Sequence, residues 1–319
     1  MAVLYTSTAT TSLGGTAGAA GLVQLAFDKN LEFQLRAATL VTDIADVHPT
    51  NQTNPGSTII LQTYVDLPTD VAGATLTETV DPDSVSLATP TSVSITLAEY
   101  GRSTIVTRAL NLFSLKDVNM DVANIVGQDL INTVDSVAMN KLILGTNVLY
   151  AGATATNTVT VTKTATITSA NVRRIVATME QNNALYKKDS LFWGGIDAFV
   201  AHDLRTESGA LGWLIPNQYG ADQSRLWNGE IGTYEGVFFI KSSRMYKAND
   251  GAAAIPVHRT IFAGAQAFAS AYGEAPHIVI GNVVDRLKRL HPVGWTGTFG
   301  FNVYRQACLY RLESGSSLD

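Results

Sequence analysis

The stretch DVNMDVANIVGQDLINTVDSVAMNKLILGT, residues 117–146, carries the clearest periodicity in the chain. Its apolar residues recur at steps of three and four, the spacing that places side chains on one face of an α-helix. They are Val118, Val122, Ile125, Val126, Leu130, Val134, Val137, Ala138 and Leu142. Asp117 is a suitable N-cap and Gly145 a suitable stop signal. The sequence therefore predicts a helix roughly 40 Å long, enough to form the backbone of a domain.

Two strand patterns flank a polar excursion upstream of this helix. Apolar and polar residues alternate at Ile59 and Leu61, and again across residues 93–97. The intervening residues 66–92 are rich in Thr, Asp and Pro and include three acidic residues, Glu78, Asp81 and Asp83. We expect a long protruding hairpin with an acidic tip. Because a two-stranded excursion is marginal alone, it needs another surface to lie on.

The first 35 residues form a segment of a different kind. Residues 6–21, TSTATTSLGGTAGAAG, contain only Thr, Ser, Ala, Gly and one Leu, a composition that cannot form a packed core. We expect residues 1–35 to be an arm that is either disordered or ordered by a neighbouring subunit.

The middle of the chain predicts a mixed α and β domain. Residues 158–168, TVTVTKTATIT, favour a half-buried strand or hairpin, and Ser169 then caps a helix that ends near Asn182. A short strand at 191–193 leads through a glycine pair into a helix that begins at Asp197. Because strand patterns return at the end of the chain, we expect a discontinuous domain with a second domain inserted in it. The predicted fold class is α+β.

Composition and charge exclude several functions. Charged residues make up only 15% of the chain and hydrophobic residues 46%, so much of the surface is uncharged and suited to meeting other protein surfaces. A net charge of −5 argues against specific nucleic-acid binding. The single Cys308 cannot form an internal disulfide, and neither a signal peptide nor a membrane span is expected.

Motifs for catalysis, cofactors and metals are missing from the sequence. It has no GxxxxGK[ST] phosphate loop and no GxSxG elbow. Gly294, Gly297 and Gly300 lack the GxGxxG spacing and are interpreted as turns or bulges in a strand. His202 and Asp203 are interpreted as a solvated polar edge. No histidine pair has metal-ligand spacing among His48, His202, His258, His277 and His291. We therefore predict no catalytic, cofactor-binding or metal residues.

The acidic tip has two interpretations. It is either a solvated charge group, or it meets basic residues of another copy of the chain. The candidate basic partners are Arg173, Arg174, Arg286, Lys288 and Arg289.

Several segments, in their order, resemble the Hong Kong 97 capsid fold of tailed-phage major capsid proteins. Residues 93–108 resemble the strand, Glu-Tyr-Gly turn and return strand before the family's spine helix, and residues 117–146 resemble the spine helix itself. Residues 229–240 resemble a hairpin of the axial domain, and residues 262–268 a late family segment. The motif Val293-Gly294-Trp295 is similar to the terminal strand of the peripheral domain.

The resemblance implies an arm, an extended loop and two domains. The arm is residues 1–35, and the peripheral domain is residues 36–147 and 261–319. This domain includes the extended loop, residues 50–97, and the spine helix, while the axial domain is residues 148–260. In that family the extended loop lies across a neighbouring subunit.

The function implied is a shell subunit that assembles into pentamers and hexamers around phage DNA, without sequence-specific DNA binding. The expected partners are further copies of the chain, a separate scaffolding protein and a portal. A decoration protein is a further possible partner, and no membrane is expected. The expected location is the virion, after assembly in the host cytoplasm. An encapsulin-like compartment shell, a β-rich surface adhesin and an enzyme without short motifs remain alternatives; electron microscopy of the purified protein separates the shells from the rest.

Overall fold

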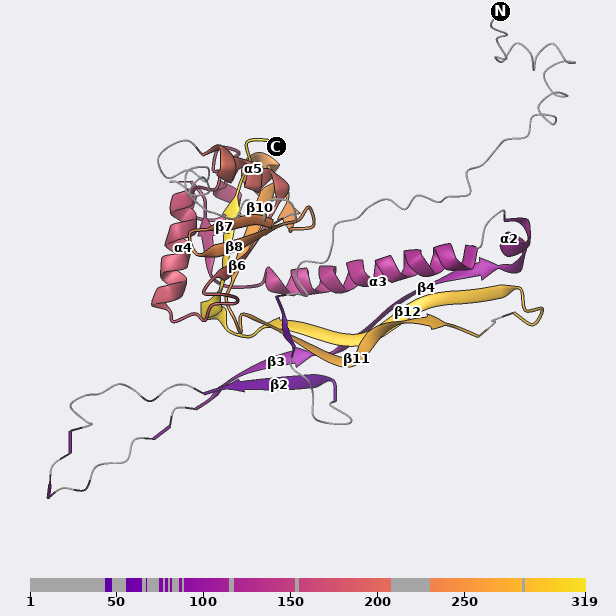
Figure 1. The fold of residues 1–319 in the computed structure, drawn as a ribbon, viewed down its shortest axis with the longest axis horizontal. Helices are drawn as coiled ribbons and strands as arrows, with labels where there is room; N and C mark the ends of the chain where they lie inside the picture. The colour runs from indigo at the N-terminus through magenta and orange to yellow at the C-terminus, as the bar shows by residue number, and fades with distance from the viewer. Residues whose placement is uncertain are drawn as a thin grey trace, which may run out of the picture.

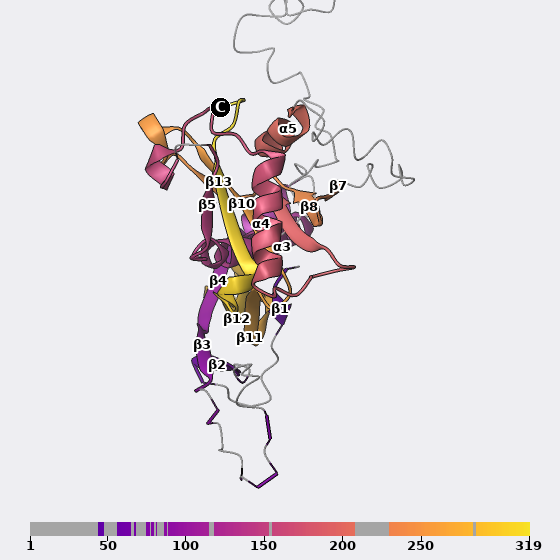
Figure 2. The same ribbon diagram turned by 90° about the vertical axis from the view of Figure 1, so that its left-hand side faces the viewer.

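The computed structural model describes residues 44–47, 56–64, 67, 75–76, 78–79, 81, 86–87, 89–114, 118–152, 155–207, 230–282 and 285–319. These residues form a compact body around a seven-stranded sheet and a long extension around a four-stranded sheet (Figure 1). This extension is called the arm below, and the name does not refer to the N-terminal segment of residues 1–35. A two-stranded hairpin extends from the near end of the arm. Seen after a 90° turn, the hairpin points away from the body (Figure 2). The molecule is therefore elongated, and the hairpin tip and the outer end of the arm point in opposite directions.

The arm sheet has the strand order β1-β11-β12-β4. Its strands are β1 (Asp46–Val47), β4 (Ala98–Thr107), β11 (Phe268–Ile280) and β12 (Leu290–Val303). The central strand β12 is antiparallel to both β11 and β4, and it pairs with β4 from Leu290↔Thr107 to Phe299↔Ala98. The short helix α2 (Arg108–Phe113) follows β4 at the outer end of the arm (Figure 1).

The two predicted strand patterns pair with each other as the base of a hairpin. Strand β2 (Thr58–Thr63) is antiparallel to β3 (Thr91–Thr96), with Ile59 opposite Ile95. Ile95 is fully buried. The alternation of apolar and polar residues thus identified both the strands and the faces they bury.

The longest helix, α3 (Val118–Leu142), confirms the main prediction over the described residues. Asp117 lies outside them. The helix ends at Leu142, before Gly145, and Gly145 does not adopt the left-handed conformation of a helix cap. A Cβ atom there would lie 2.8 Å from Cδ2 of Leu309, so the glycine allows close packing instead.

Apolar packing and one carboxylate attach α3 to the arm sheet and to the body. Its buried apolar residues are Val126, Val134, Ala138, Met139 and Leu142. Asp129 Oδ2 accepts a 2.9 Å hydrogen bond from Trp295 Nε1 on β12. Asp129 Oδ1 accepts a second 2.9 Å hydrogen bond from Arg102 on β4. One helix carboxylate therefore joins two strands of the sheet, which fixes the rotation of the helix on it.

The body sheet has the strand order β5-β13-β10-β6-β8-β7, with β9 paired to β10. The strands are β5 (Val148–Tyr150), β6 (Phe192–Ile196), β7 (Glu230–Tyr234), β8 (Val237–Lys241), β9 (Lys247–Ala248), β10 (Val257–Ala263) and β13 (Leu309–Ser314). The helices are α4 (Ser169–Gln181) and α5 (Ala198–Thr206), with short 3₁₀ turns at Thr158–Thr160, Ala252–Ala254 and Gln306–Cys308. Thus the chain leaves the arm sheet after β12 and returns to the body sheet at β13.

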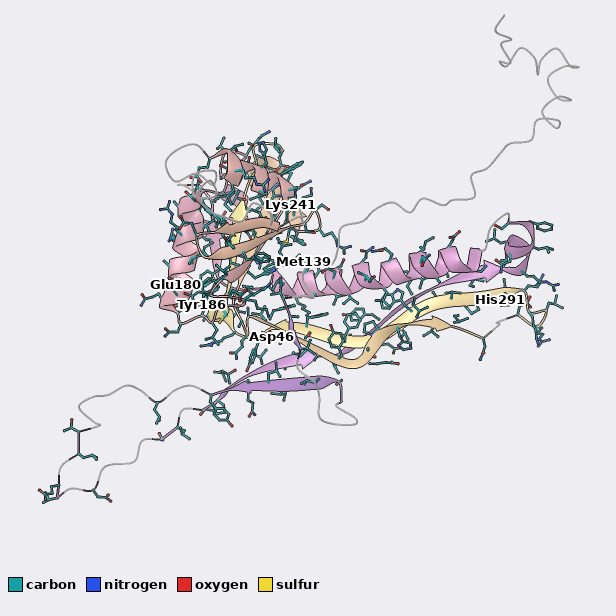
Figure 3. The ribbon with its side chains drawn as sticks, in the orientation of Figure 1. Asp46, Met139, Glu180, Tyr186, Lys241 and His291 are labelled. Atoms are coloured by element: carbon teal, nitrogen blue, oxygen red, sulfur yellow. The ribbon has the colours of Figure 1, made fainter. Side chains whose placement is uncertain are left out.

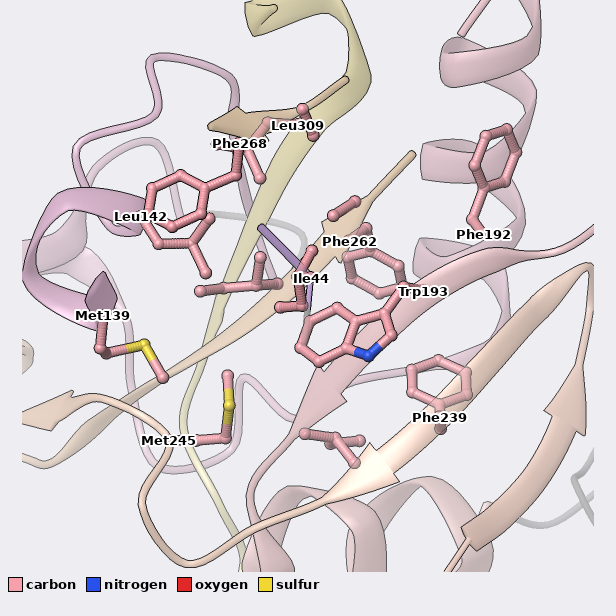
Figure 4. Packing of buried hydrophobic residues seen from close by; sticks show 14 of the residues in the cluster. Ile44, Met139, Leu142, Phe192, Trp193, Phe239, Met245, Phe262, Phe268 and Leu309 are labelled. Carbon is pink, nitrogen blue, oxygen red and sulfur yellow. The ribbon is translucent and has the colours of Figure 1, made fainter. Parts of the chain in front are cut away.

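One hydrophobic core runs from the end of α3 into the body sheet (Figure 4). Met139 and Leu142 of α3 belong to the same buried cluster as Trp193, Phe239 and Phe262 of the body. A fully buried large side chain contributes about 1.5–3 kcal/mol relative to its exposed state. The shared core therefore holds body and arm in a fixed relation.

The prediction of a strand or hairpin over residues 158–168 is wrong. The segment contains a 3₁₀ turn, in which Asn157 Oδ1 accepts from Thr160 N and Thr160 Oγ1 accepts from Asn157 N. Val161, Ala165 and Ile167 are buried, so the alternation is real. The local hydrogen bonds of Asn and Thr side chains replace the strand pairing that Thr-rich sequences favour.

Two boundaries near the second and third helices also differ from the prediction. Thr168, and not Ser169, caps α4, since its hydroxyl accepts from Asn171 N. Gly194 and Gly195 are not a turn but lie inside the buried strand β6. A Cβ atom on Gly194 would lie 2.7 Å from Val237, so glycine is needed for close strand packing.

Gly294, Gly297 and Gly300 do not form turns, but Gly297 lies in a register irregularity of the β11–β12 pair, consistent with the predicted alternative of bulges. All three lie within β12, and each lets another segment approach closely. A Cβ atom on Gly300 would lie 2.4 Å from the carbonyl oxygen of Thr96, at the hairpin root. The irregularities of this strand pair lie between register positions Tyr272 and His277 of β11.

Candidate assembly surfaces

The hairpin tip lies away from the body (Figure 1), and its described residues include acidic and apolar ones. Glu78 and Asp81 are exposed, and neither forms an ion pair with the other residues that the structure describes. Asp83 lies outside the described residues. Leu76 and Leu87, 74% and 75% exposed, lie in the same excursion. Large apolar side chains that are this exposed are available to contact a partner.

The hairpin root, in contrast, packs on its own chain. Ile95 and Leu97 are buried against Ala269 and Ala271 of β11. Thr63 Oγ1 donates a 3.0 Å hydrogen bond to the hydroxyl of Tyr304. The root is therefore part of the subunit core, whereas the described tip residues are exposed.

The outer end of the arm is basic and apolar. The β11–β12 connection carries exposed Arg286 and Lys288, and Leu287 between them is 67% exposed. Arg289 is also exposed, but its Nε lies 2.6 Å from Oδ2 of Asp285 in the same turn. Figure 3 marks this end of the arm with His291.

Helix α2 adds exposed apolar side chains to the arm end. Its backbone begins with Arg108, whose N–H donates to the carbonyl oxygen of Arg289 at 2.8 Å. Leu112 and Phe113 are 72% and 83% exposed, and α2 has no buried residue. Helix α2 therefore has no apolar partner that covers it among the residues that the structure describes.

The basic residues of α4 are placed elsewhere, on the compact body. Arg173 forms an ion pair at 3.6 Å with Glu235 and donates to Ser169, whereas Arg174 is exposed. The structure thus separates the predicted acidic and basic residues. The acidic tip and the basic arm end lie at opposite ends of the molecule, so they cannot meet within one chain (Figure 1).

Polar contacts join the body to the arm, and sequence reasoning missed them. Arg244, after β8, reaches the buried Asp135 of α3 with Nε 3.2 Å from Oδ2. Lys187 lies 2.7 Å from Asp46 Oδ1, while Asp46 Oδ2 accepts from Gln266 N. The two residues of each pair are more than 100 residues apart in the sequence, so no local pattern indicates these contacts.

The body also contains buried charged residues that the sequence did not predict. Asp203 was expected at a solvated edge, but it is buried and accepts from the backbone N–H of Ser317 at 3.0 Å. Glu313 is fully buried between Arg259 and Arg311, with Nε distances of 3.2 and 2.9 Å. His258 is buried between two carboxylates.

Burial also raises the pKa of the Cys308 thiol, which makes it a poor nucleophile.

Within the described residues, no cluster of His, Cys, Asp and Glu is arranged to hold a metal ion. No helix in this part of the chain is both long and apolar enough to cross a membrane.

The fold is that of phage capsid shells. A capsid chain of cyanophage Pam1 superposes with a TM-score of 0.75 at 14% identity, covering 94% of this chain and 98% of that one. The capsid of cyanophage P-SCSP1u gives a TM-score of 0.73 at 14% identity, covering 99% and 100%. The capsid of Ralstonia phage GP4 gives 0.68 at 14% identity, covering 95% and 97%. The resemblance to the Hong Kong 97 fold is confirmed.

The family of the chain follows from its sequence. The family described as phage capsid protein matches residues 128–307, more than half of the chain. The chain belongs to the phage capsid protein family. It is a structural component of the virion and not an enzyme. No curated protein sequence matches it.

Proposed function

We propose that this subunit assembles into pentamers and hexamers that close an icosahedral head around phage DNA. The contact that joins neighbours is the hairpin tip of one copy on the outer arm end of another. The observation that carries this proposal is the opposite placement of the two surfaces within one chain (Figure 1). Such a contact uses different patches on its two sides and so propagates from copy to copy.

Charge and hydrophobicity are complementary at the two ends. The tip offers Glu78, Asp81 and exposed leucines, and the arm end offers Arg286, Lys288 and the apolar face of α2. Each exposed ion pair contributes only about 0.2–1 kcal/mol, so the apolar contacts are expected to supply most of the affinity. Repetition over many copies then stabilises the shell.

We place the domain boundary by the two sheets. The peripheral domain keeps residues 36–147, with β11 and β12, and the axial domain keeps residues 148–260. The remainder of β10 and strand β13, which the sequence analysis assigned to the peripheral domain with residues 261–319, are moved to the axial domain because they lie in the body sheet. Sheet pairing supports this division, since β13 pairs with β5 and β10. A separate scaffolding protein and a portal are the expected assembly partners.

Charge reversal tests the contact. Purified protein should form closed particles of uniform size in negative-stain micrographs. The triple variant Glu78→Lys, Asp81→Lys and Asp83→Lys should lose them while keeping the wild-type unfolding temperature. The matching Gln and Asn substitutions serve as a control and should retain most particles.

The complementary reversal is decisive. Arg286→Glu with Lys288→Glu should also block assembly, and combining both reversals should restore particles. Normal assembly of either reversed variant alone would contradict the proposed contact. DNA-filled particles in infected cells then distinguish a phage head from a compartment with protein cargo.

A further inference from the structure

The body contains a buried histidine held from two sides. His258 lies on β10 and is 1% exposed. Its Nδ1 is 2.8 Å from Oδ2 of Asp197, the residue that precedes α5, and its Nε2 is 2.8 Å from Oδ2 of Asp319. The Nε2 contact is a hydrogen bond, whereas the Nδ1 contact is an ion pair without hydrogen-bond alignment.

These two contacts together require a charged ring. A ring nitrogen without a proton carries a lone pair, which a carboxylate oxygen at 2.8 Å repels. Neutral imidazole has one N–H and can satisfy one carboxylate only. With both carboxylates ionised, His258 is therefore an imidazolium that bridges Asp197 and Asp319.

The bridge holds the segment Gly315–Asp319, which follows β13. Ser316 is fully buried, and Ser317 N donates a 3.0 Å hydrogen bond to Asp203 of α5. A Cβ atom on Gly315 would lie 2.4 Å from the carbonyl oxygen of Thr162, so the segment also lies tightly on residues 162–163. Three separate parts of the body thus meet at this segment.

Other charged groups surround the bridge. The groups on the packed elements are Lys247 of β9, Arg259 of β10, Glu313 of β13, Asp203 and His202 of α5, Asp250, and Lys163. Lys247 is register-paired with His258 and favours ionised Asp197. Arg259 is neutralised by Glu313 and Asp250, and Asp203 is held by Ser317. His258 is thus the titrating group that faces both Asp197 and Asp319.

We propose that His258 is a proton-operated clasp, which fixes Gly315–Asp319 to the body while the ring is charged and releases it when the ring loses a proton to solvent. The release removes the attraction to Asp319 and leaves a buried carboxylate without its cationic partner. The segment then separates from α5 and from residues 162–163. This device belongs to the fold of the single subunit and does not depend on the proposed contact between copies.

The sign of the pH dependence follows from the pKa directions. Burial opposes the charged ring, but the contacts with Asp197 and Asp319 outweigh burial and raise the pKa of His258. Stability from the clasp is therefore complete below the pKa of the unfolded ring and is lost as pH rises through the higher folded value. Burial also opposes ionised Asp197, but His258, the N–H of Ala198 and Lys247 lower its pKa. The stability that ionised Asp197 contributes is therefore lost only in acid, as pH falls through this lowered pKa.

Two measurements on the wild-type full chain test the clasp. Exchange of the imidazole C2 hydrogen, followed by mass spectrometry, gives the pKa of each histidine separately. His258 should titrate above 6.5, its ordinary value. Amide-exchange protection of residues 315–319 should fall about tenfold per pH unit between the pKa of His258 in the released state and its higher pKa in the clasped state. Above the higher pKa the protection should stay constant.

Variants separate the clasp from a purely structural role. Asp319→Asn should lower the pKa of His258 and reduce protection of Gly315–Asp319 at pH 6, with little change in protection of α3. His277→Gln is the matched control, since His277 is exposed on strand β11 of the other sheet, and it should leave both readouts unchanged. A ring that titrates at or below 6.5, or a segment whose protection does not change across the His258 titration, overturns the proposal.

Discussion

Replacing Arg244 with methionine tests how strongly the body is attached to the spine helix. Arg244 Nε lies 3.2 Å from Asp135 Oδ2, and its NH2 group donates to the carbonyl oxygen of Asn132 at 2.9 Å and to Ser136. The side chain of Asp135 is 2% exposed and that of Arg244 is 22% exposed. Methionine keeps an unbranched apolar side chain, although a shorter one, and removes the charge, so the buried carboxylate loses the guanidinium.

The magnitude follows from this burial. Removing one partner of a buried ion pair costs about 3–5 kcal/mol, and partial exposure of Arg244 places the value at the lower end. We expect a loss of about 3 kcal/mol, which is more than a hundredfold in the unfolding equilibrium. The double variant Asp135→Asn with Arg244→Met should cost less than the sum of the single variants, because the buried carboxylate is removed together with the guanidinium.

Urea unfolding of the unassembled subunit measures these values, with the buried Trp193 and Trp295 as fluorescent probes. Arg174→Met is the matched control, since Arg174 is exposed on α4, and it should change stability by less than about 0.5 kcal/mol. A loss below about 1 kcal/mol for Arg244→Met, or full additivity in the double variant, would refute the reasoning.

Three further substitutions have predicted directions. Gly300→Ala should destabilise the subunit by about 1–3 kcal/mol in calorimetry, because its Cβ atom would collide with the Thr96 carbonyl oxygen, and an unchanged unfolding temperature would contradict this. Gly127→Ala should stabilise it by about 0.5–1 kcal/mol, since the new methyl group lies 3.6 Å from Ile278 and helix interiors disfavour glycine; a loss in urea titrations would show that reasoning wrong. Thr168→Ala should cost about 1 kcal/mol through the lost cap of α4, and unaltered amide exchange in its first turn would argue against the cap.

The parts of the fold that sequence predicted are those with local periodicity. Helix α3 and the two strands of the hairpin follow from the spacing of apolar residues within each segment, because each segment buries one face. The apolar face of α4 follows in the same way, with Val172 and Met179 both fully buried. These predictions hold because the face that is apolar in the sequence is also the face that tertiary packing buries.

Other features depend on residues far apart in the chain. Asp135 and Arg244 are 109 residues apart, and no spacing rule indicates that this carboxylate is buried. The placement of the acidic tip opposite the basic arm end follows only from the assembled fold. Residues 158–168 were predicted wrongly because side-chain hydrogen bonds decided the backbone conformation over the strand preference of threonine.

The hairpin root has a mechanical consequence. Strand β3 ends at Thr96 and β4 begins at Ala98, so the hairpin continues almost directly into the edge of the arm sheet. Tension applied at the tip would run lengthwise along these strands. Hydrogen bonds between strands are perpendicular to that direction, and the ten residue pairs joining β4 to β12 would be loaded in shear together. A subunit built in this way resists stretching along its length far better than peeling from its side.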